Sequence, residues 1–101
     1  MKIEKINKKK NNQYQVILSD NTSLSFYDDT IIKFNLLSKK EFDKKKLEEI
    51  VEFNSDLEAY YSALKFIKTK LRTKKEIEEK LKKLGYTNNV VLNTIKRLEE
   101  Q

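Results

Sequence analysis

The sequence predicts an α+β fold that is mainly helical, and the spacing of its apolar residues is the main reason. Near the N-terminus apolar and polar residues alternate, as in a strand with one buried face. From about Asp43 apolar residues recur every three or four positions, as in amphipathic helices. We therefore expect a strand-rich unit with a short helix over residues 1–42, a connecting helix over 43–54 and a three-helix bundle repeat over 55–101.

The strand-rich unit is predicted from one turn and its flanks. Val16 and Leu18 alternate with polar residues, and Leu24 and Phe26 resume the alternation after residues 19–22. The turn sequence Ser-Asp-Asn-Thr favours Asx turns and tolerates a left-handed backbone. These features predict a β-hairpin.

Further elements are expected around this hairpin. Residues 1–6 can add a third strand, and Asp28 and Asp29 are typical of the first turn of a short helix. Such additions are needed because an isolated hairpin is marginally stable in water. A helix beginning near Asp43 is expected to turn three apolar residues inward, namely Leu47, Ile50 and Val51.

Three helices are predicted in the last part of the chain. Capping boxes at Ser55–Glu58 and Thr73–Glu76 are expected to open two of them, Gly85 to end the second, and a third to begin near Asn88. The residues expected inward are Leu57, Tyr60, Leu64, Ile67 and Leu71, then Ile77, Leu81 and Leu84, then Val91, Ile95 and Leu98. Ion pairs are expected between Glu76 and Lys80, Glu78 and Lys82, and Glu79 and Lys83.

The residue types that are missing argue against catalysis. The chain has no His, no Cys and a single Gly, so the usual general base, thiolate nucleophile, zinc ligands and phosphate-binding glycine loops are excluded. We expect no enzyme activity, no metal or cofactor and no small-molecule substrate. The sequence has no cysteine, no signal peptide and no apolar span. We therefore expect it in the cytoplasm, with no membrane partner.

One ordered set of residues spans the helical part, namely Ala59-Tyr60, Ala63-Leu64, Arg72-Thr73, Glu76, Leu81, Lys82-Lys83-Leu84-Gly85-Tyr86, Ile95 and Leu98. With these residues in matching order, the helical part resembles the RecX family, whose members regulate the RecA recombinase. The resemblance is strong over residues 59–98 and looser over the strand-rich start. Family members usually continue into two more three-helix repeats. The resemblance therefore implies the N-terminal region of a longer regulator, an inhibitor of homologous recombination that binds RecA-type filaments.

A local excess of positive charge is the candidate contact surface. Residues 65–83 hold nine basic and three acidic residues within a chain of net charge +6. The candidate contacts to a partner or to phosphate are Lys65, Lys68, Lys70, Arg72, Lys74, Lys75, Lys82 and Lys83. Arg72 is the strongest candidate, because its planar guanidinium suits phosphate or carboxylate. A simple solvated face is the competing interpretation.

The aromatic residues and the function leave alternatives open. Tyr60, Tyr61, Phe66 and Tyr86 are expected in the core rather than as platforms for bases, and Lys8–Lys10 as a solvated tip. A nucleic-acid-binding helical module that contacts the DNA phosphate backbone is the second function. A structural interaction domain is the third. Phosphate binding would weaken steeply as salt rises, which separates the second function from the first.

Overall fold

The structure, a computed structural model, describes residues 1–100. The chain divides into two compact units, Met1–Asn54 and a second that begins at Ser55. Helix α2 (Lys44–Thr69) contributes residues to both, and each unit has its own hydrophobic core. Within residues 1–100, none of the helices combines the length and the hydropathy needed to cross a membrane.

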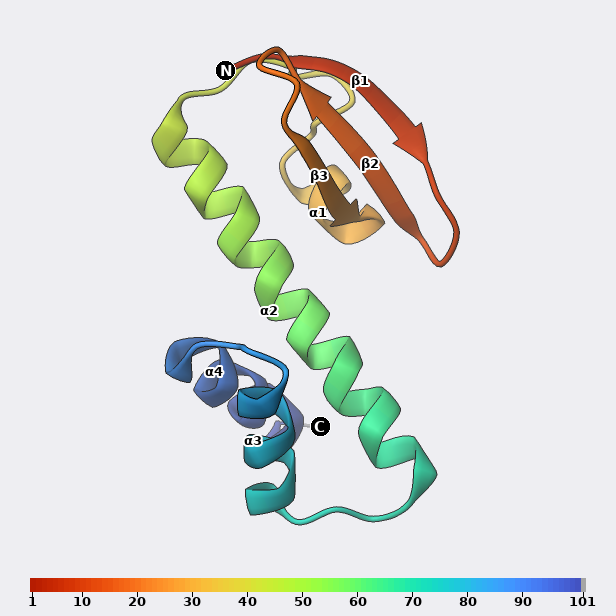
Figure 1. Cartoon of the computed structure of the whole chain (residues 1–101), viewed down its shortest axis with the longest axis vertical. Helices are drawn as coiled ribbons and strands as arrows, with labels where there is room; N and C mark the ends of the chain where they lie inside the picture. Colours follow the sequence, from red (N-terminus) through yellow and green to blue (C-terminus); the bar gives the residue numbers. More distant parts are fainter. Residues whose placement is uncertain (101) are drawn as a thin grey trace. The chain divides into compact units, whose positions relative to one another are not determined.

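The first unit is built on a three-stranded antiparallel sheet, as predicted. Strands β1 (Ile3–Lys8), β2 (Gln13–Leu18) and β3 (Ser23–Tyr27) lie in the order β1-β2-β3, so β2 is central (Figure 1). Alternate residues of β2 and β3 are buried on one face because successive side chains of a strand point to opposite sides.

Asparagine supplies the left-handed backbone at the turns of this unit. Asn11 and Asn12, both with φ of 60°, connect β1 to β2, and Asn21, with φ of 70°, lies between β2 and β3. Asn35, with φ of 52°, follows α1 (Asp28–Lys33). Asparagine is enriched in this region because its short polar side chain tolerates it and can bond locally.

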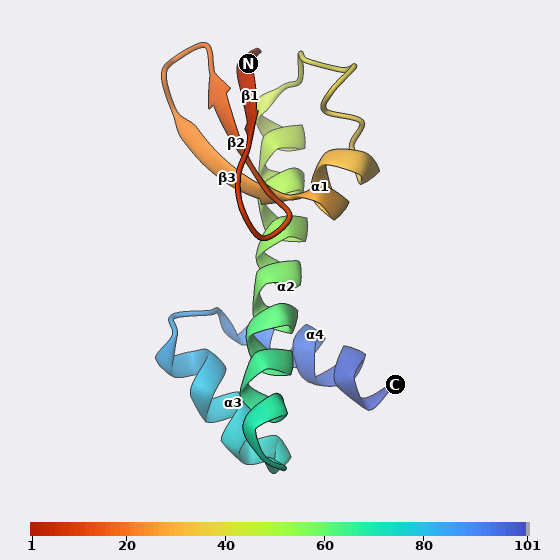
Figure 2. The same cartoon turned by 90° about the vertical axis from the view of Figure 1, so that its right-hand side faces the viewer.

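Helices cover one face of the sheet. Figure 2 shows α1 and the first turns of α2 on the same side of the sheet. The predicted short helix at Asp28 is confirmed, with Asp28 and Asp29 in its first turn. The buried core contains Ile3, Val16, Leu18, Phe26, Ile31, Leu36 and Ile50.

Asn54 is a buried polar residue of α2 that joins this helix to β3 and α1. Its side-chain oxygen accepts hydrogen bonds from the Tyr27 amide at 2.9 Å and from the Thr30 hydroxyl at 2.8 Å. Its side-chain nitrogen donates to the Ser25 carbonyl at 3.3 Å. α2 is therefore tied to β3 and α1 by directional bonds as well as by apolar packing.

The helix start expected at Ser55 is wrong, because α2 runs without interruption from Lys44 to Thr69. It is Asp43 that caps the helix, since its Oδ1 accepts from the Lys46 amide at 2.8 Å. Neither Gly nor Pro occurs within α2, so nothing in the backbone favours a break. Inside a continuous helix the backbone amides near Ser55 are already bonded, and a capping box has no unpaired donors to satisfy.

The second unit packs the C-terminal half of α2 with α3 (Lys74–Lys83) and α4 (Asn88–Glu99). Its core contains Ala59, Ala63, Ile77, Leu81, Val90, Val91 and Ile95. The capping box at Thr73 is confirmed, with Thr73 Oγ1 accepting from the Glu76 amide at 3.1 Å and the Thr73 amide donating to Glu76 Oε1 at 3.0 Å. Gly85, with φ of 98°, follows α3 as predicted.

Several residues expected to be inward are exposed. Leu71 is 94% exposed because α2 ends at Thr69, and Leu84 is exposed because α3 ends at Lys83. Val51 and Tyr61 are also exposed, because their neighbours Ile50 and Tyr60 occupy the buried face and adjacent helical residues point about 100° apart. The predicted inward positions of these four residues are wrong.

The three ion pairs expected along α3 are also wrong. Among residues 1–100, no ion pair joins Glu76 to Lys80, Glu78 to Lys82 or Glu79 to Lys83. The carboxylate of Glu76 pairs with Arg72 instead, at 3.7 Å. Ion pairs between long exposed side chains contribute little to stability, so other contacts easily replace them.

We expect Asn54→Ala to destabilise the protein by about 1–3 kcal/mol, because the Tyr27 amide and the Thr30 hydroxyl lose their acceptor inside the unit. Urea denaturation followed by far-ultraviolet circular dichroism measures the change. Asn93→Ala, on the exposed face of α4, is the matched control and should change stability by less than about 0.5 kcal/mol. Equal midpoints for the two variants would contradict the role given to Asn54.

Candidate partner-binding surface

The predicted basic residues lie on the outer faces of α2 and α3 and in the linker between them. Lys65 and Lys68 are exposed on the side of α2 away from Ala59 and Ala63. Lys75 and Lys82, seven residues apart, share the face of α3 opposite its buried residues Ile77 and Leu81.

The structure divides these residues into two groups. Five exposed lysines lie in the linker or near it in the sequence, and with Leu71 they are called the linker surface here: Lys65, Lys68, Lys70, Lys74 and Lys75. Lys82 and Lys83 lie at the other end of α3, about 10 Å from Lys75 along the helix axis, given a rise of about 1.5 Å per residue. Lys74 Nζ lies 3.8 Å from Glu99 Oε1, so its charge is partly offset.

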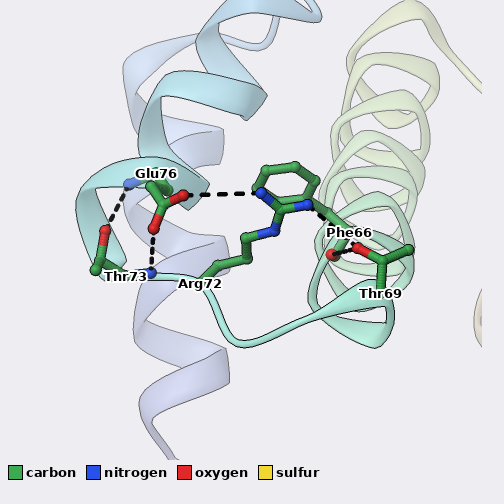
Figure 3. Close-up of polar contacts among 5 residues, drawn as sticks. All are labelled: Phe66, Thr69, Arg72, Thr73 and Glu76. Carbon is green, nitrogen blue, oxygen red and sulfur yellow. Dashed lines mark hydrogen bonds and ion pairs between the residues drawn. The ribbon is translucent and has the colours of Figure 1, made fainter.

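Arg72 is engaged inside the unit, in contrast to its predicted role as the leading phosphate contact. Its guanidinium carbon lies 4.0 Å from the centroid of the Phe66 ring (Figure 3). Nη1 lies 3.7 Å from Glu76 Oε2, and Nη2 donates to Thr69 Oγ1 at 3.2 Å. Only 19% of the side chain is exposed, so Arg72 connects the end of α2 to the start of α3.

Further cations lie over the Phe66 and Tyr60 rings of this unit. Lys80 Nζ lies 5.6 Å from the Phe66 centroid, and the Arg97 guanidinium lies 3.9 Å from the Tyr60 centroid. The Tyr86 hydroxyl donates to Glu58 Oε1 at 2.7 Å. Tyr60 is buried, and Phe66 and Tyr86 pack partly buried against the core, which confirms their predicted place there.

Arg97 is a contact that the sequence analysis missed. Tyr60 and Arg97 are far apart in the chain, and neither lies in a pattern that pairs them. The only local signal is the position of Arg97 in the last turn of α4, where a basic residue is favoured by the helix dipole.

Leu71 projects from the linker, whereas Arg72 stacks on Phe66. The residues between α2 and α3 are not helical, so Leu71 does not continue the apolar stripe of α2. With Arg72 folded onto Phe66, Leu71 is left 94% exposed between flanking lysines. An exposed aliphatic side chain within a cationic surface suits a protein surface that combines an apolar depression with acidic groups.

Known proteins share both the sequence and the fold of this chain. The model of a family described as "RecX, first three-helix domain" matches residues 59–98. "Regulatory protein RecX" of Clostridium tetani (strain Massachusetts / E88) is 31% identical over 99% of this chain. The protein of the same name from Streptococcus pneumoniae (strain CGSP14) is 36% identical over 99% of the chain. The chain belongs to the RecX family.

A solved structure supports this membership over the whole chain. The protein described as "Crystal structure of regulatory protein RecX" superposes with a TM-score of 0.80 and 27% identity over 99% of this chain. The chain spans 45% of the Clostridium relative, 38% of the Streptococcus relative and 50% of the solved chain. The match to RecX proteins therefore covers nearly all of this chain and half or less of those proteins.

The RecX resemblance is carried mostly by residues with structural roles. Ala59 and Ala63 are fully buried, which allows close helix packing, and Thr73 with Glu76 caps α3. Gly85 takes the left-handed conformation after α3. The linker surface lies within the matched range 59–98, between these structural positions.

We expect Arg72→Ala to lower the free energy of unfolding by about 1–2 kcal/mol, because it removes a largely covered guanidinium from the Phe66 ring and leaves Glu76 without its cation. Chemical denaturation measures the change. Lys75→Ala, which removes an exposed charge from the same segment, should change stability by less than about 0.5 kcal/mol. A smaller loss for Arg72→Ala than for Lys75→Ala would show that Arg72 is not structural.

Glu76 should make the stability of this unit sensitive to acid. The Thr73 amide donates to its carboxylate, and the positive charges of Arg72 and Lys70 add to this, so the pKa of Glu76 is lowered from 4.5. A carboxyl whose pKa is lower in the folded state contributes stability above its unfolded pKa and loses it as the pH falls through the folded pKa. Melting temperatures of the wild type and Glu76→Gln should therefore differ most near neutral pH and converge as the pH falls below 4.5 and through the lowered folded pKa. A constant difference across this range would contradict the assignment.

Proposed function

We propose that this chain is part of a regulator that inhibits homologous recombination by binding RecA-type recombinase filaments. The proposal rests on its RecX-family membership and on the linker surface as the contact region. The observation that carries it is the exposure of Leu71 among lysines, since this combination favours a protein partner over bare phosphate. Lys82 and Lys83 extend the same positive charge along α3 toward the partner.

The electrostatics of the linker surface fit a filament that presents acidic protein groups. Lysines on the rim of an interface increase the association rate and orient the partner, while a central apolar residue supplies much of the binding free energy. Leu71 is the exposed apolar residue of the linker, with Lys68 and Lys70 before it and Lys74 and Lys75 after it in the sequence. The stacked Arg72 holds the linker in this arrangement.

A nucleic-acid-binding module is the second candidate, favoured by the exposed lysines of α2 and α3. It would bind naked DNA through phosphates, with an affinity that falls steeply as salt rises, at a log–log slope of about −0.9 for each phosphate neutralised. A filament contact centred on Leu71 would depend less on salt, because apolar burial is not screened. The two candidates are therefore separable by a salt titration.

We expect Leu71→Ala to weaken binding to a recombinase filament by about tenfold, because a central exposed anchor commonly contributes more than 1 kcal/mol. Fluorescence anisotropy of the labelled chain, titrated with filaments assembled on single-stranded DNA and with the same DNA alone, measures both affinities. The melting temperature should stay unchanged, since Leu71 touches no core.

Leu92→Ala is the matched control, since Leu92 is another exposed leucine of the second unit and lies on α4. It should bind the filament like the wild type. Unchanged filament binding by Leu71→Ala would remove the linker surface from the interface. Tight, salt-sensitive binding to naked DNA without a preference for the filament would favour the second candidate.

A further inference from the structure

We propose that a cavity in the first unit binds an acidic peptide segment through one apolar anchor residue. The cavity has a volume of about 320 Å³ and lies where α1, the loop after it and α2 meet. Its apolar wall is formed by Phe34, Leu36, Phe42 and Ile50. This volume is at the lower end of the range of about 300–1,000 Å³ for ligand pockets, so it suits a single side chain.

The polar part of the cavity lining is cationic. Lys33, Lys39 and Lys46 line it together with Asn35, and none of its eight lining residues is acidic. Lys33 Nζ lies 6.0 Å and Lys46 Nζ lies 5.2 Å from the centroid of the Phe34 ring, so both ammonium groups are held near the apolar wall. A bound anion would therefore lie next to an apolar anchor.

A neighbouring hollow shares Lys39 and Lys46 with the cavity but adds acidic residues. It has a volume of about 350 Å³ and is lined by Lys39, Glu41, Phe42, Asp43, Lys45, Lys46 and Glu49. Its acids offset its lysines. Because Lys46 Nζ lies 3.3 Å from Glu49 Oε2, the charge of Lys46 is partly offset in the cavity as well, and Lys33 and Lys39 supply most of the positive charge of the cavity. Lys33 lines only the cationic cavity and Lys45 only the neighbouring one, which makes them a matched pair for testing.

The cavity favours a peptide over a nucleic acid strand. Stacking of bases requires an open aromatic face, but the Phe34 ring already lies under the Lys46 ammonium and packs edge-on with Phe53 at 5.5 Å. Exposed aliphatic residues adjoin the lining instead, since Ile32 precedes Lys33 and Leu37 follows Leu36. Aliphatic and cationic groups side by side complement a segment of acidic and apolar residues.

The cavity is preformed by backbone hydrogen bonds. The Leu36 amide donates to the Ile31 carbonyl at 3.0 Å and the Lys39 amide to the Asn35 carbonyl at 2.8 Å, which fixes the loop after α1. The Phe42 amide donates to the Met1 carbonyl at 2.9 Å, which ties the start of α2 to the edge of the sheet. A rigid site loses little conformational entropy when a ligand binds.

The test uses the whole chain and a short fluorescent peptide of aspartate and glutamate with one central phenylalanine. Fluorescence anisotropy gives the affinity, and two-dimensional NMR of the 15N-labelled chain locates the site. We expect shifts at Lys33, Asn35 and Lys39 and none along α3. Replacing the peptide's phenylalanine with alanine should weaken binding at least about tenfold, as for a buried anchor.

Variants of the chain complete the test. Lys33→Glu should weaken peptide binding at least about tenfold, whereas Lys45→Glu, with the same change of charge, should weaken it less than about threefold. Equal melting temperatures would show that both variants fold. The proposal is overturned if the peptide shifts resonances elsewhere in the chain, if the alanine peptide binds with equal affinity, or if the two variants have equal effects. It is also overturned if a single-stranded oligonucleotide displaces the peptide from the cavity and binds there with higher affinity than the peptide.

Discussion

The stacking of Arg72 on Phe66 determines the form of the second unit at the point where α2 gives way to α3. α3 needs Thr73 in an extended conformation to cap its first turn, so the chain must leave helical geometry before that residue. The guanidinium bonds to Thr69 at the end of α2 and pairs with Glu76 in the first turn of α3. Leu71 is exposed next to this contact, so the linker combines a structural residue with an accessible apolar one.

In the first unit, a small sheet with one covered face holds a helix in a defined position. Apolar packing alone permits sliding, because it has no preferred direction. Asn54 removes this freedom with hydrogen bonds to residues of β3 and α1. The loop after α1 is fixed in the same way, and the cavity beside it keeps its lysines close to its apolar wall.

The sequence predicted those features whose causes are local. Alternation around Val16 identified the strands, Thr73 and Glu76 identified a helix start, and Gly85 identified a helix end. Ser55 misled because the same motif occurs inside α2, where the backbone amides are already bonded within the helix.

The candidate site was harder to predict, because charge patterns do not distinguish a solvated cation from a stacked one. Arg72 and Phe66 are six residues apart and meet only because the chain turns between them. Leu71 fitted the apolar stripe by spacing, and its exposure depends on where α2 ends. The cavity of the first unit joins a loop to two helices, so no single stretch of sequence indicated it.

The left-handed asparagines have a consequence for a chain with so small a core. Glycine adopts such turns without strain but leaves the denatured chain with many more accessible conformations. Asn11, Asn12, Asn21 and Asn35 accept some strain in the native state and restrict the denatured ensemble at the same time. Part of the stability of the sheet unit thus originates in the reduced conformational entropy of its unfolded form.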